Sequence, residues 1–134
     1  MGTQGKRFDF ERLDVFDVSL DAVAAMDEMA EDLPDGRGYI RDQLRRAANS
    51  IPLNIAEGAG EYAPLEKARF YRIAKRSTTE CAGQLLVARR LGLLPAIRID
   101  PSLVLLERVL AMLVTLIRRS GERASSRIDT ATES

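Results

Sequence analysis

Apolar residues recur every three or four positions in four separate stretches of this sequence, and this period restricts the fold more than any other feature. Such spacing places the apolar side chains on one face of an α-helix. The predicted helices span residues 10–33, 39–57, 64–91 and 100–119. Because no stretch alternates like a β-strand and the connections are short, the sequence predicts an all-α fold, an antiparallel up-down four-helix bundle.

Each predicted helix has its own apolar stripe. The stripes are Leu13, Phe16, Leu20, Val23, Met26 and Ala30; Ile40, Leu44, Ala47, Ile51 and Ile55; Phe70, Ile73, Ala74, Ser77, Cys81, Leu85, Ala88 and Leu91; and Leu103, Leu106, Leu110, Leu113 and Ile117. The fourth helix has further apolar residues around its sides, namely Val104, Leu105, Val109, Met112, Val114 and Leu116. This excess predicts a second contact, such as a subunit interface.

Glycine and proline indicate where the helices end. Gly58-Ala59-Gly60 is predicted to end the second helix through a left-handed glycine cap, and Gly121 to end the fourth. Asp100-Pro101 is predicted to begin the fourth helix as N-cap and first-turn residue. Pro52 predicts a kink or a local break near residues 48–52. The expected organisation is a flexible N-terminus (1–9), the bundle (10–120) and a disordered tail (121–134).

Composition narrows the class of protein. The chain has 134 residues, one cysteine and no histidine. A lone cysteine cannot form an internal disulfide, and the absence of histidine removes the commonest metal ligand and general base. No apolar run approaches the length of a membrane span. We also expect no secretory signal, because no apolar core follows Lys6 and Arg7. We therefore expect a soluble, cytoplasmic protein that is not an enzyme, needs no cofactor or metal, and has no membrane partner.

Charge is unevenly distributed along the chain although the formal net charge is zero. Residues 1–36 include three basic and ten acidic side chains, whereas residues 37–98 include twelve basic and five acidic ones. Such asymmetry suits nucleic-acid binding, head-to-tail association of subunits, or pairing between neighbouring helices.

The basic residues of the second and third predicted helices fall on shared faces. They are Arg41, Arg45 and Arg46 in the second helix, and Arg69, Arg72, Lys75 and Arg76 in the third. Side chains three, four or seven positions apart lie on one side of a helix, so this band can neutralise phosphates. Two simpler interpretations stay open, a solvated face and a surface that pairs with the acidic first helix.

Three features invite a catalytic or ligand-binding interpretation, and each has a simpler one. Gly58-Ala59-Gly60 resembles the start of a dinucleotide loop, but it follows a helix instead of a strand, so a helix-ending turn fits better. Glu80 is predicted to form an ion pair with an arginine across the bundle, the alternative being an acid or base with a raised pKa. Cys81, in the middle of an apolar stripe, is predicted to be a packed core thiol and not a nucleophile.

One long motif resembles a known family. The run Gln43-Leu44-Arg45-Arg46-Ala47-Ala48-Asn49-Ser50-Ile51-Pro52-Leu53-Asn54-Ile55-Ala56-Glu57-Gly58 is similar to the signature of four-helix-bundle proteins encoded in intervening sequences of bacterial 23S ribosomal RNA genes. A second block, with Ile73-Ala74-Lys75-Arg76-Ser77 and Glu80, resembles that family's second motif. The resemblance covers about residues 8–119. Two positions depart from the pattern: Glu61 stands where a basic residue is usual, and Lys75-Arg76 where Arg-Gly is common.

The resemblance implies a homopentamer, in which four-helix protomers form a tapered barrel with a basic surface. It also implies a fold similar to the accessory variability determinant of diversity-generating retroelements, which binds a reverse transcriptase and nucleic acid; no catalytic activity is implied. Within the motifs, the residues expected to be structural or to lie at a subunit interface are Asn54, Glu57, Gly58 and Glu80. Asn54 and Glu57 are expected either to hold the turn between the second and third helices or to contact another subunit.

The leading hypothesis is a non-enzymatic oligomer, with a pentamer expected, that binds RNA or DNA as a ribonucleoprotein accessory module and can have a nucleic-acid-processing protein as a further partner. Its predicted phosphate contacts are the seven basic residues of the band. The alternative is a protein-only scaffold, in which the acidic first helix of one subunit meets the basic helices of the next. An enzyme that uses Glu80 or Cys81 is the third hypothesis.

Overall fold

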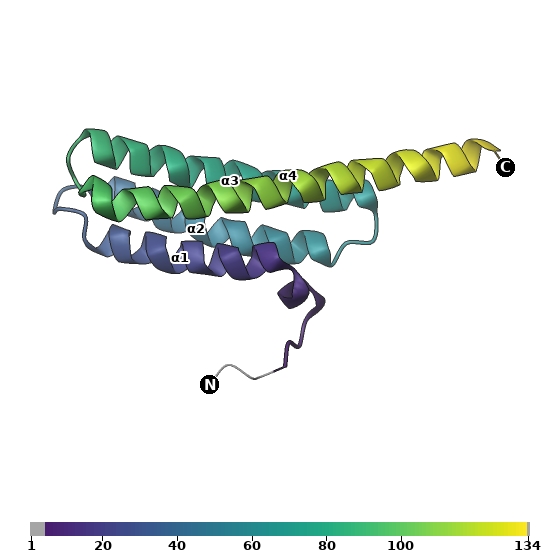
Figure 1. Cartoon of the computed structure of the whole chain (residues 1–134), viewed down its shortest axis with the longest axis horizontal. Coiled ribbons are helices and arrows are strands. Elements are labelled where there is room, and N and C mark those ends of the chain that lie inside the picture. Colours follow the sequence, from purple (N-terminus) through teal and green to yellow (C-terminus); the bar gives the residue numbers. More distant parts are fainter. Residues whose placement is uncertain (1–4, 134) are drawn as a thin grey trace.

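Four long helices make up almost all of the computed structural model, which describes residues 5–133 and their side chains as far as residue 127 (Figure 1). A short 3₁₀ turn, η1 (Asp9–Arg12), precedes α1 (Asp14–Glu31), α2 (Gly38–Ala59), α3 (Pro64–Arg90) and α4 (Ala96–Glu133). No strand occurs among the described residues. The predicted all-α class is therefore confirmed.

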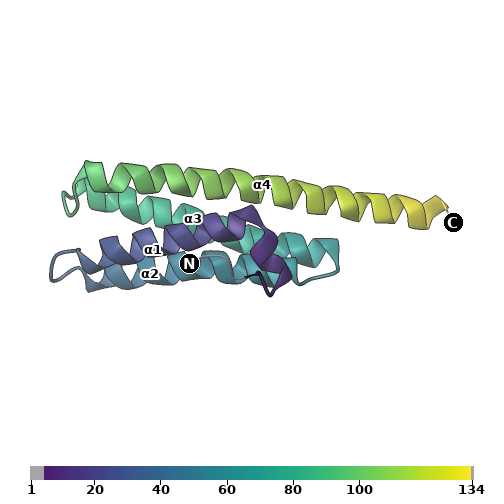
Figure 2. The same ribbon diagram turned by 60° about the horizontal axis from the view of Figure 1, so that its bottom comes forward.

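The helices run up and down in chain order, and each loop reverses the direction (Figures 1 and 2). α1 packs against α2 and α4, and α3 packs against the same two helices, so the four surround one core. α4 is longer than its neighbours, and its C-terminal part continues past the end of the other three helices (Figure 2). Assembly into a pentamer stays a prediction.

The first helix differs from its prediction in its start and in its buried face. The 3₁₀ turn ends at Arg12, Leu13 is extended, and α1 begins at Asp14, whose carboxylate suits a helix N-terminus. The buried apolar stripe is Val15, Val18, Ala22, Met26 and Met29, while the predicted member Leu20 is exposed. The predicted members Met26 and Ala30 are buried. In the first half of the helix, however, the packing against α2 and α4 buries Val15, Val18 and Ala22 and leaves Leu13 and Phe16 only partly buried.

The second helix fits its predicted stripe. All five predicted positions are buried, from Ile40 to Ile55. α2 is continuous through Pro52, so the predicted local break does not occur. Pro52 is itself buried, and packing holds its ring in the helix although it donates no backbone hydrogen bond.

The two helix ends that contain glycine differ from each other. At the end of α3, Gly92 has a φ of 68°, and the amides of Gly92 and Leu93 donate to Arg89 O and Ala88 O, which is a Schellman cap. At the end of α2, Gly60 has a φ of −83°. The predicted left-handed glycine cap at Gly58-Ala59-Gly60 is therefore wrong, and other groups must satisfy these carbonyls.

Both predicted ends of the fourth helix are wrong. α4 begins at Ala96, directly after Pro95, whose carbonyl accepts hydrogen bonds from the amides of Arg98 and Ile99. Asp100 is not an N-cap but accepts a hydrogen bond from Arg89. At the other end the helix continues through Gly121 as far as Glu133, so residues 122–133 of the predicted disordered tail are helical. A glycine costs about 1 kcal/mol in a helix, which a helix already formed upstream tolerates.

The N-terminal segment has little regular structure before η1. Residues 5–8 are irregular, and Phe10 packs its ring against Phe16 of α1 at 4.8 Å between centroids. The rest of the predicted flexible N-terminus, residues 1–4, lies outside the described residues, as does Ser134 of the tail. Within the described part of the chain, no helix has the length and apolar character needed to span a bilayer.

Candidate nucleic-acid interface

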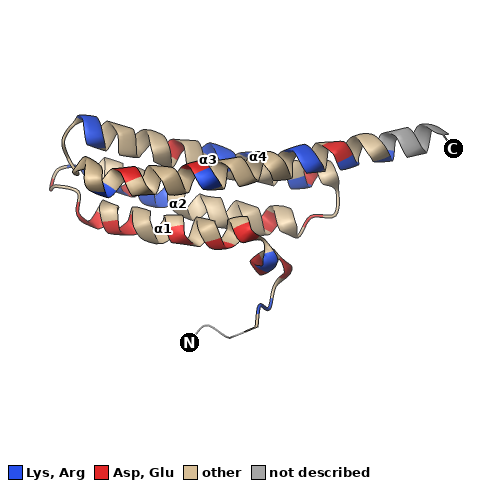
Figure 3. Cartoon of the chain, viewed as in Figure 1, with Lys and Arg blue, Asp and Glu red and all other residues tan. Residues whose placement is uncertain are grey.

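A shallow groove between α2 and α3 brings several of the predicted basic residues together. The groove has a volume of about 740 Å³. On one side it is lined by Arg46 and Ser50 of α2, which are one helical turn apart. α3 lines the other side with Arg72, Ile73, Lys75, Arg76, Ser77, Thr79 and Glu80. Figure 3 shows the basic residues on α2 and α3 and the acidic residues along α1. We call this surface the α2–α3 groove.

Three cations of the groove have no acidic partner. Arg46 Nη2 lies 3.0 Å from Glu80 Oε1, so this pair crosses from α2 to α3 as an arginine–glutamate pair was predicted to do. The side chains of Arg72, Lys75 and Arg76 are exposed and form no ion pair or hydrogen bond with any residue that the structure describes. The groove therefore has a net positive charge, and its cations keep their hydrogen-bond donors for a ligand.

Hydroxyl groups form the polar floor of the groove. Ser77 Oγ donates to Ser50 Oγ over 2.9 Å, which joins α3 to α2. Asn54 Nδ2 donates to Ser50 Oγ at 3.0 Å and to Ser50 O at 2.9 Å. Asn54 was expected to hold the turn between α2 and α3, but its contacts lie within α2, where they orient Ser50. Hydroxyls beside cations are common phosphate contacts. The predicted site did not include Ser50 or Ser77, although Ser50 shares a helix face with Arg46.

Two of the predicted phosphate contacts face α1 instead. Arg45 Nε lies 2.9 Å from Asp27 Oδ1, and Arg45 Nη2 lies 2.8 Å from Glu31 Oε2. The hydrogen bond to Glu31 and then the one to Asp27 raise the pKa of Arg45. Arg41 Nε donates to Ala30 O and its Nη2 to Leu33 O, each over 2.9 Å. For Arg41 and Arg45, the interpretation as partners of the acidic first helix is the one that fits.

Arg41 stabilises the end of α1, so its replacement should affect folding. Its guanidinium gives two hydrogen bonds to carbonyls at a helix C-terminus, where a cation also interacts favourably with the helix dipole. We expect Arg41→Gln to lower the free energy of unfolding by about 2 kcal/mol, as urea titration measures. Arg37→Gln, which removes a neighbouring cation that makes no such bonds to α1, is the matched control. Equal stability of the two variants would contradict this role.

Arg69 lies on α3 outside the groove. It forms an ion pair with Glu66 at 3.0 Å, and its guanidinium stacks over the ring of Phe70 at 4.4 Å from the centroid. Both contacts are within one turn of α3. The structure thus divides the seven predicted cations into four that line the groove, two that hold α1, and Arg69 with its local partners.

The model of a family described as 23S rRNA-intervening sequence protein matches residues 11–115. The chain belongs to this family. No curated protein matches the chain significantly. The matched range includes all of α1, α2 and α3, and therefore every residue that lines the groove.

In this intervening-sequence protein, Gly58 has a packing role that its predicted turn role did not foresee. A Cβ atom at this position would lie 2.7 Å from Tyr71 Cε1, 2.9 Å from Tyr71 Cδ1 and 3.2 Å from Lys67 O. Lys67 Nζ donates to Gly58 O at 2.8 Å and to Ala59 O at 3.2 Å. A lysine of α3 thus satisfies the carbonyls at the end of α2, where the sequence predicted a glycine cap.

The other motif residues have simpler surroundings. Glu57 is exposed and makes no hydrogen bond or ion pair with the described residues, so no contact to the α2–α3 turn is found. Its role at a subunit interface stays a prediction, as does that of Asn54.

The surroundings of Cys81 and Glu80 favour structural roles in this intervening-sequence protein. Cys81 is fully buried. Burial raises the pKa of its thiol to about 12, with a smaller contribution from Glu80 and an opposing effect of Arg46. A thiol with this pKa is protonated at neutral pH and is a poor nucleophile. Among the described residues, no group of three or more side chains is arranged to hold a metal ion. That the protein is not an enzyme stays a prediction.

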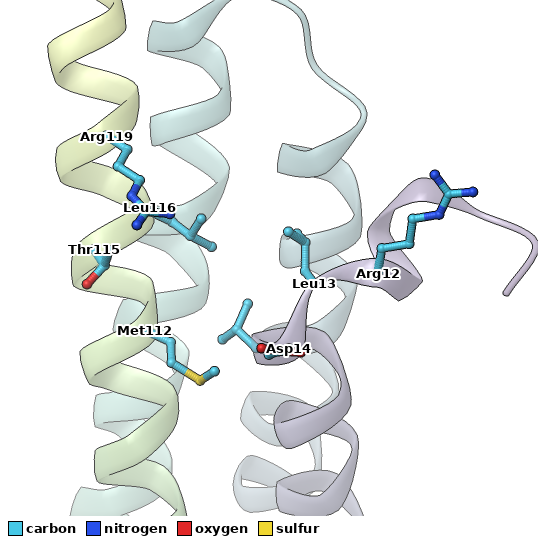
Figure 4. A pocket seen from close by; sticks show the side chains of 8 residues that line it. Arg12, Leu13, Asp14, Met112, Thr115, Leu116 and Arg119 are labelled. Carbon is cyan, nitrogen blue, oxygen red and sulfur yellow. The ribbon is translucent and has the colours of Figure 1, made fainter. Parts of the chain in front are cut away.

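A second hollow lies between the start of α1 and α4 (Figure 4). Leu116 and Met112 of α4 face Leu13 and the first turn of α1 across it, while Arg12 points away. Its volume is about 330 Å³. Its lining combines these apolar side chains with a polar rim and has no set of catalytic groups, so it does not compete with the groove as a candidate site.

Proposed function

We propose that this intervening-sequence protein is a non-enzymatic, cytoplasmic nucleic-acid-binding accessory module that contacts phosphates through the α2–α3 groove. One observation supports this most strongly: Arg72, Lys75 and Arg76 lie together in the groove without an acidic partner in the described part of the chain. Cations that are not already paired can replace the counterions of a nucleic-acid backbone, and the released ions drive binding. Arg46 adds a fourth cation that Glu80 balances.

The groove favours binding that depends little on base sequence. Its unpaired cations come from exposed positions on α3, and its hydroxyls lie at the floor. Contacts of this kind position a phosphate backbone and do not read base edges. We propose that the protein is a homopentamer, in which each subunit presents the same groove. A nucleic-acid strand that contacts several grooves would bind more tightly than a strand that contacts one.

The salt dependence of binding tests the proposal. We expect the full-length protein to bind a fluorescent single-stranded RNA and its DNA counterpart at about 50 mM salt, and to lose affinity steeply toward about 200 mM. Three phosphate contacts correspond to a slope of about −2 to −3 in a plot of log affinity against log salt for each engaged groove. Fluorescence anisotropy measures the affinity and light scattering the mass of the oligomer. The absence of binding at low salt by an intact oligomer would contradict the proposal.

A protein-only scaffold is the second candidate, and one observation favours it. Asp14, Asp21 and Glu28 of α1 are exposed and form no ion pair with the described residues. This acidic face is complementary to the groove, so that α1 of one subunit can meet the groove of the next. On this hypothesis the oligomer dissociates in high salt, and added nucleic acid produces no change in anisotropy.

A further inference from the structure

A second pocket with cationic walls lies away from the groove, at the end of the bundle where α4 passes the α2–α3 connection. Its volume is about 300 Å³, less than half that of the groove. The polar residues that line it come from η1, α3 and α4, and they are Asp9, Lys67, Tyr71, Arg119, Ser120 and Arg123. Leu13 and Leu116 form an apolar wall that it shares with the hollow of Figure 4. We call this space the end pocket.

The hydroxyl of Tyr71 is available to a ligand in the end pocket. Tyr71 is only 2% exposed, yet its hydroxyl makes no hydrogen bond with any residue that the structure describes. At the same time, no fully buried side-chain nitrogen or oxygen in the described chain lacks a partner. The phenolic oxygen is therefore not sealed in the core, and it opens onto the pocket that Tyr71 lines. The ring cannot withdraw easily, because it packs directly on the backbone of Gly58.

Three cations line the same pocket as this hydroxyl, namely Lys67, Arg119 and Arg123. Arg119 and Arg123 are one turn apart on α4 and form no ion pair with the described residues. Lys67 uses two of its three ammonium protons on Gly58 O and Ala59 O, which leaves one. Asp9 is the carboxylate in the lining, and its Oδ1 lies 4.0 Å from Arg12 Nη1. The described lining thus has three positive charges and one negative charge.

Burial and the neighbouring charges shift the pKa values of two groups in the pocket, Lys67 and Tyr71. Burial lowers the pKa of Lys67, and the charge of Arg123 lowers it further against the opposing effect of Glu61. Burial raises the pKa of Tyr71, whereas Arg123 opposes that rise. Arg123 is therefore close enough to act on both groups. An anion among the three would relieve the repulsion and accept hydrogen bonds from all of them.

We propose that the end pocket binds a phosphomonoester, with Tyr71, Arg119, Arg123 and the third proton of Lys67 as donors. The lining has an excess of two positive charges, which matches a phosphate dianion better than a monoanionic carboxylate or phosphodiester. A volume of about 300 Å³ also leaves room for the sugar or other group that bears the phosphate. Two sources share this chemistry, a small phosphorylated metabolite and the phosphorylated 5′ end of a nucleic acid.

Calorimetric titration of the full-length protein with ribose 5-phosphate, and with ribose as the uncharged comparison, tests the pocket. We expect saturable binding of ribose 5-phosphate and none of ribose. Tyr71→Phe retains the ring and removes only the hydroxyl, and it should weaken binding about tenfold. Arg123→Gln replaces an exposed residue, so folding is not at risk, and it should weaken binding by about tenfold or more. Arg108→Gln, on the same helix but outside the pocket, should change nothing.

The same variants separate the two sources. Tighter binding of a 5′-phosphorylated oligonucleotide than of its 5′-hydroxyl form, lost on Arg123→Gln, would identify a nucleic-acid end as the ligand and support the pocket. Binding of ribose 5-phosphate without that difference would support a metabolite. No binding of ribose 5-phosphate together with equal binding of both oligonucleotides, or equal affinity of Tyr71→Phe and the parent protein, would overturn the proposal. This pocket is independent of the groove, so replacing the groove cations should leave the affinity for ribose 5-phosphate unchanged.

Discussion

Replacing Arg72, Lys75 and Arg76 together by glutamine is expected to remove most of the nucleic-acid affinity of this protein. The three cations have no acidic partner in the described chain, so their loss exposes no unpaired carboxylate and should leave folding intact. For each phosphate contact that is lost, about one counterion fewer is released on binding. The salt slope should become shallower by about 2 to 3, and affinity at about 50 mM salt should fall by roughly 100-fold or more.

A variant with the same change in net charge separates the groove from the overall electrostatics of the chain. Arg90, Arg108 and Arg118 are exposed and lie outside the groove. Their joint replacement by glutamine should lower affinity only slightly. If both triple variants lose affinity equally, the groove is not the binding surface and only net charge matters. Circular dichroism and light scattering on both variants establish that fold and oligomer are retained.

Gly58→Ala is expected to cause one of the largest losses of stability that a single methyl group can produce in this chain. The new Cβ would lie within 3 Å of two ring atoms of Tyr71, a side chain that is itself buried. Crowding of this kind costs about 1–3 kcal/mol and outweighs the better helix propensity of alanine. For a domain of this size, the melting temperature should fall by about 5–10 °C.

The chain offers a matched control for this substitution. Gly83 is also inside a helix, α3, but it is exposed and a Cβ there would meet nothing within 4 Å. Gly83→Ala should therefore raise the melting temperature by a few degrees, because alanine is the better helix former by about 1 kcal/mol. A double-mutant cycle with Tyr71→Leu should reduce the cost of Gly58→Ala. If Gly58→Ala instead stabilises the protein as Gly83→Ala does, the contact with Tyr71 is not tight.

The periodicity of apolar residues predicted the existence of all four helices, and in α2 it also predicted the buried positions. In α1 it failed to choose the face, because Leu13-Phe16-Leu20 and Val15-Val18-Ala22 have the same helical spacing. Only the neighbouring helices decide between such stripes. The same limit explains the ends of α4, where Pro101 and Gly121 are usual signals of a helix boundary but packing of Ile99 and Ser120 keeps the helix intact.

The candidate site shows what spacing along one helix can predict. Arg72 and Arg76 were correctly placed on one face of α3, since that depends on the helix alone. Spacing did not reveal that Arg41 and Arg45 face the acidic α1, because this depends on which helix packs beside α2. The end pocket could not be predicted at all, since η1, α3 and α4 provide its lining from distant parts of the sequence. Lys67 and Tyr71 lack any motif that would have singled them out.

The continuation of α4 beyond the bundle has a consequence for how the protein melts. An isolated helix as short as this continuation would have only marginal stability, because the first turn of a helix is costly to form. Here the bundled part of α4 acts as that nucleus, so residues 124–127 add only one hydrogen bond at a time to a turn that already exists. Most of their side chains are exposed, and Gly121 weakens the helix shortly before this segment. Helix content in this segment should therefore decline gradually on warming. In a thermal melting curve this decline appears as a sloping native baseline, well before the four-helix core unfolds in one cooperative step.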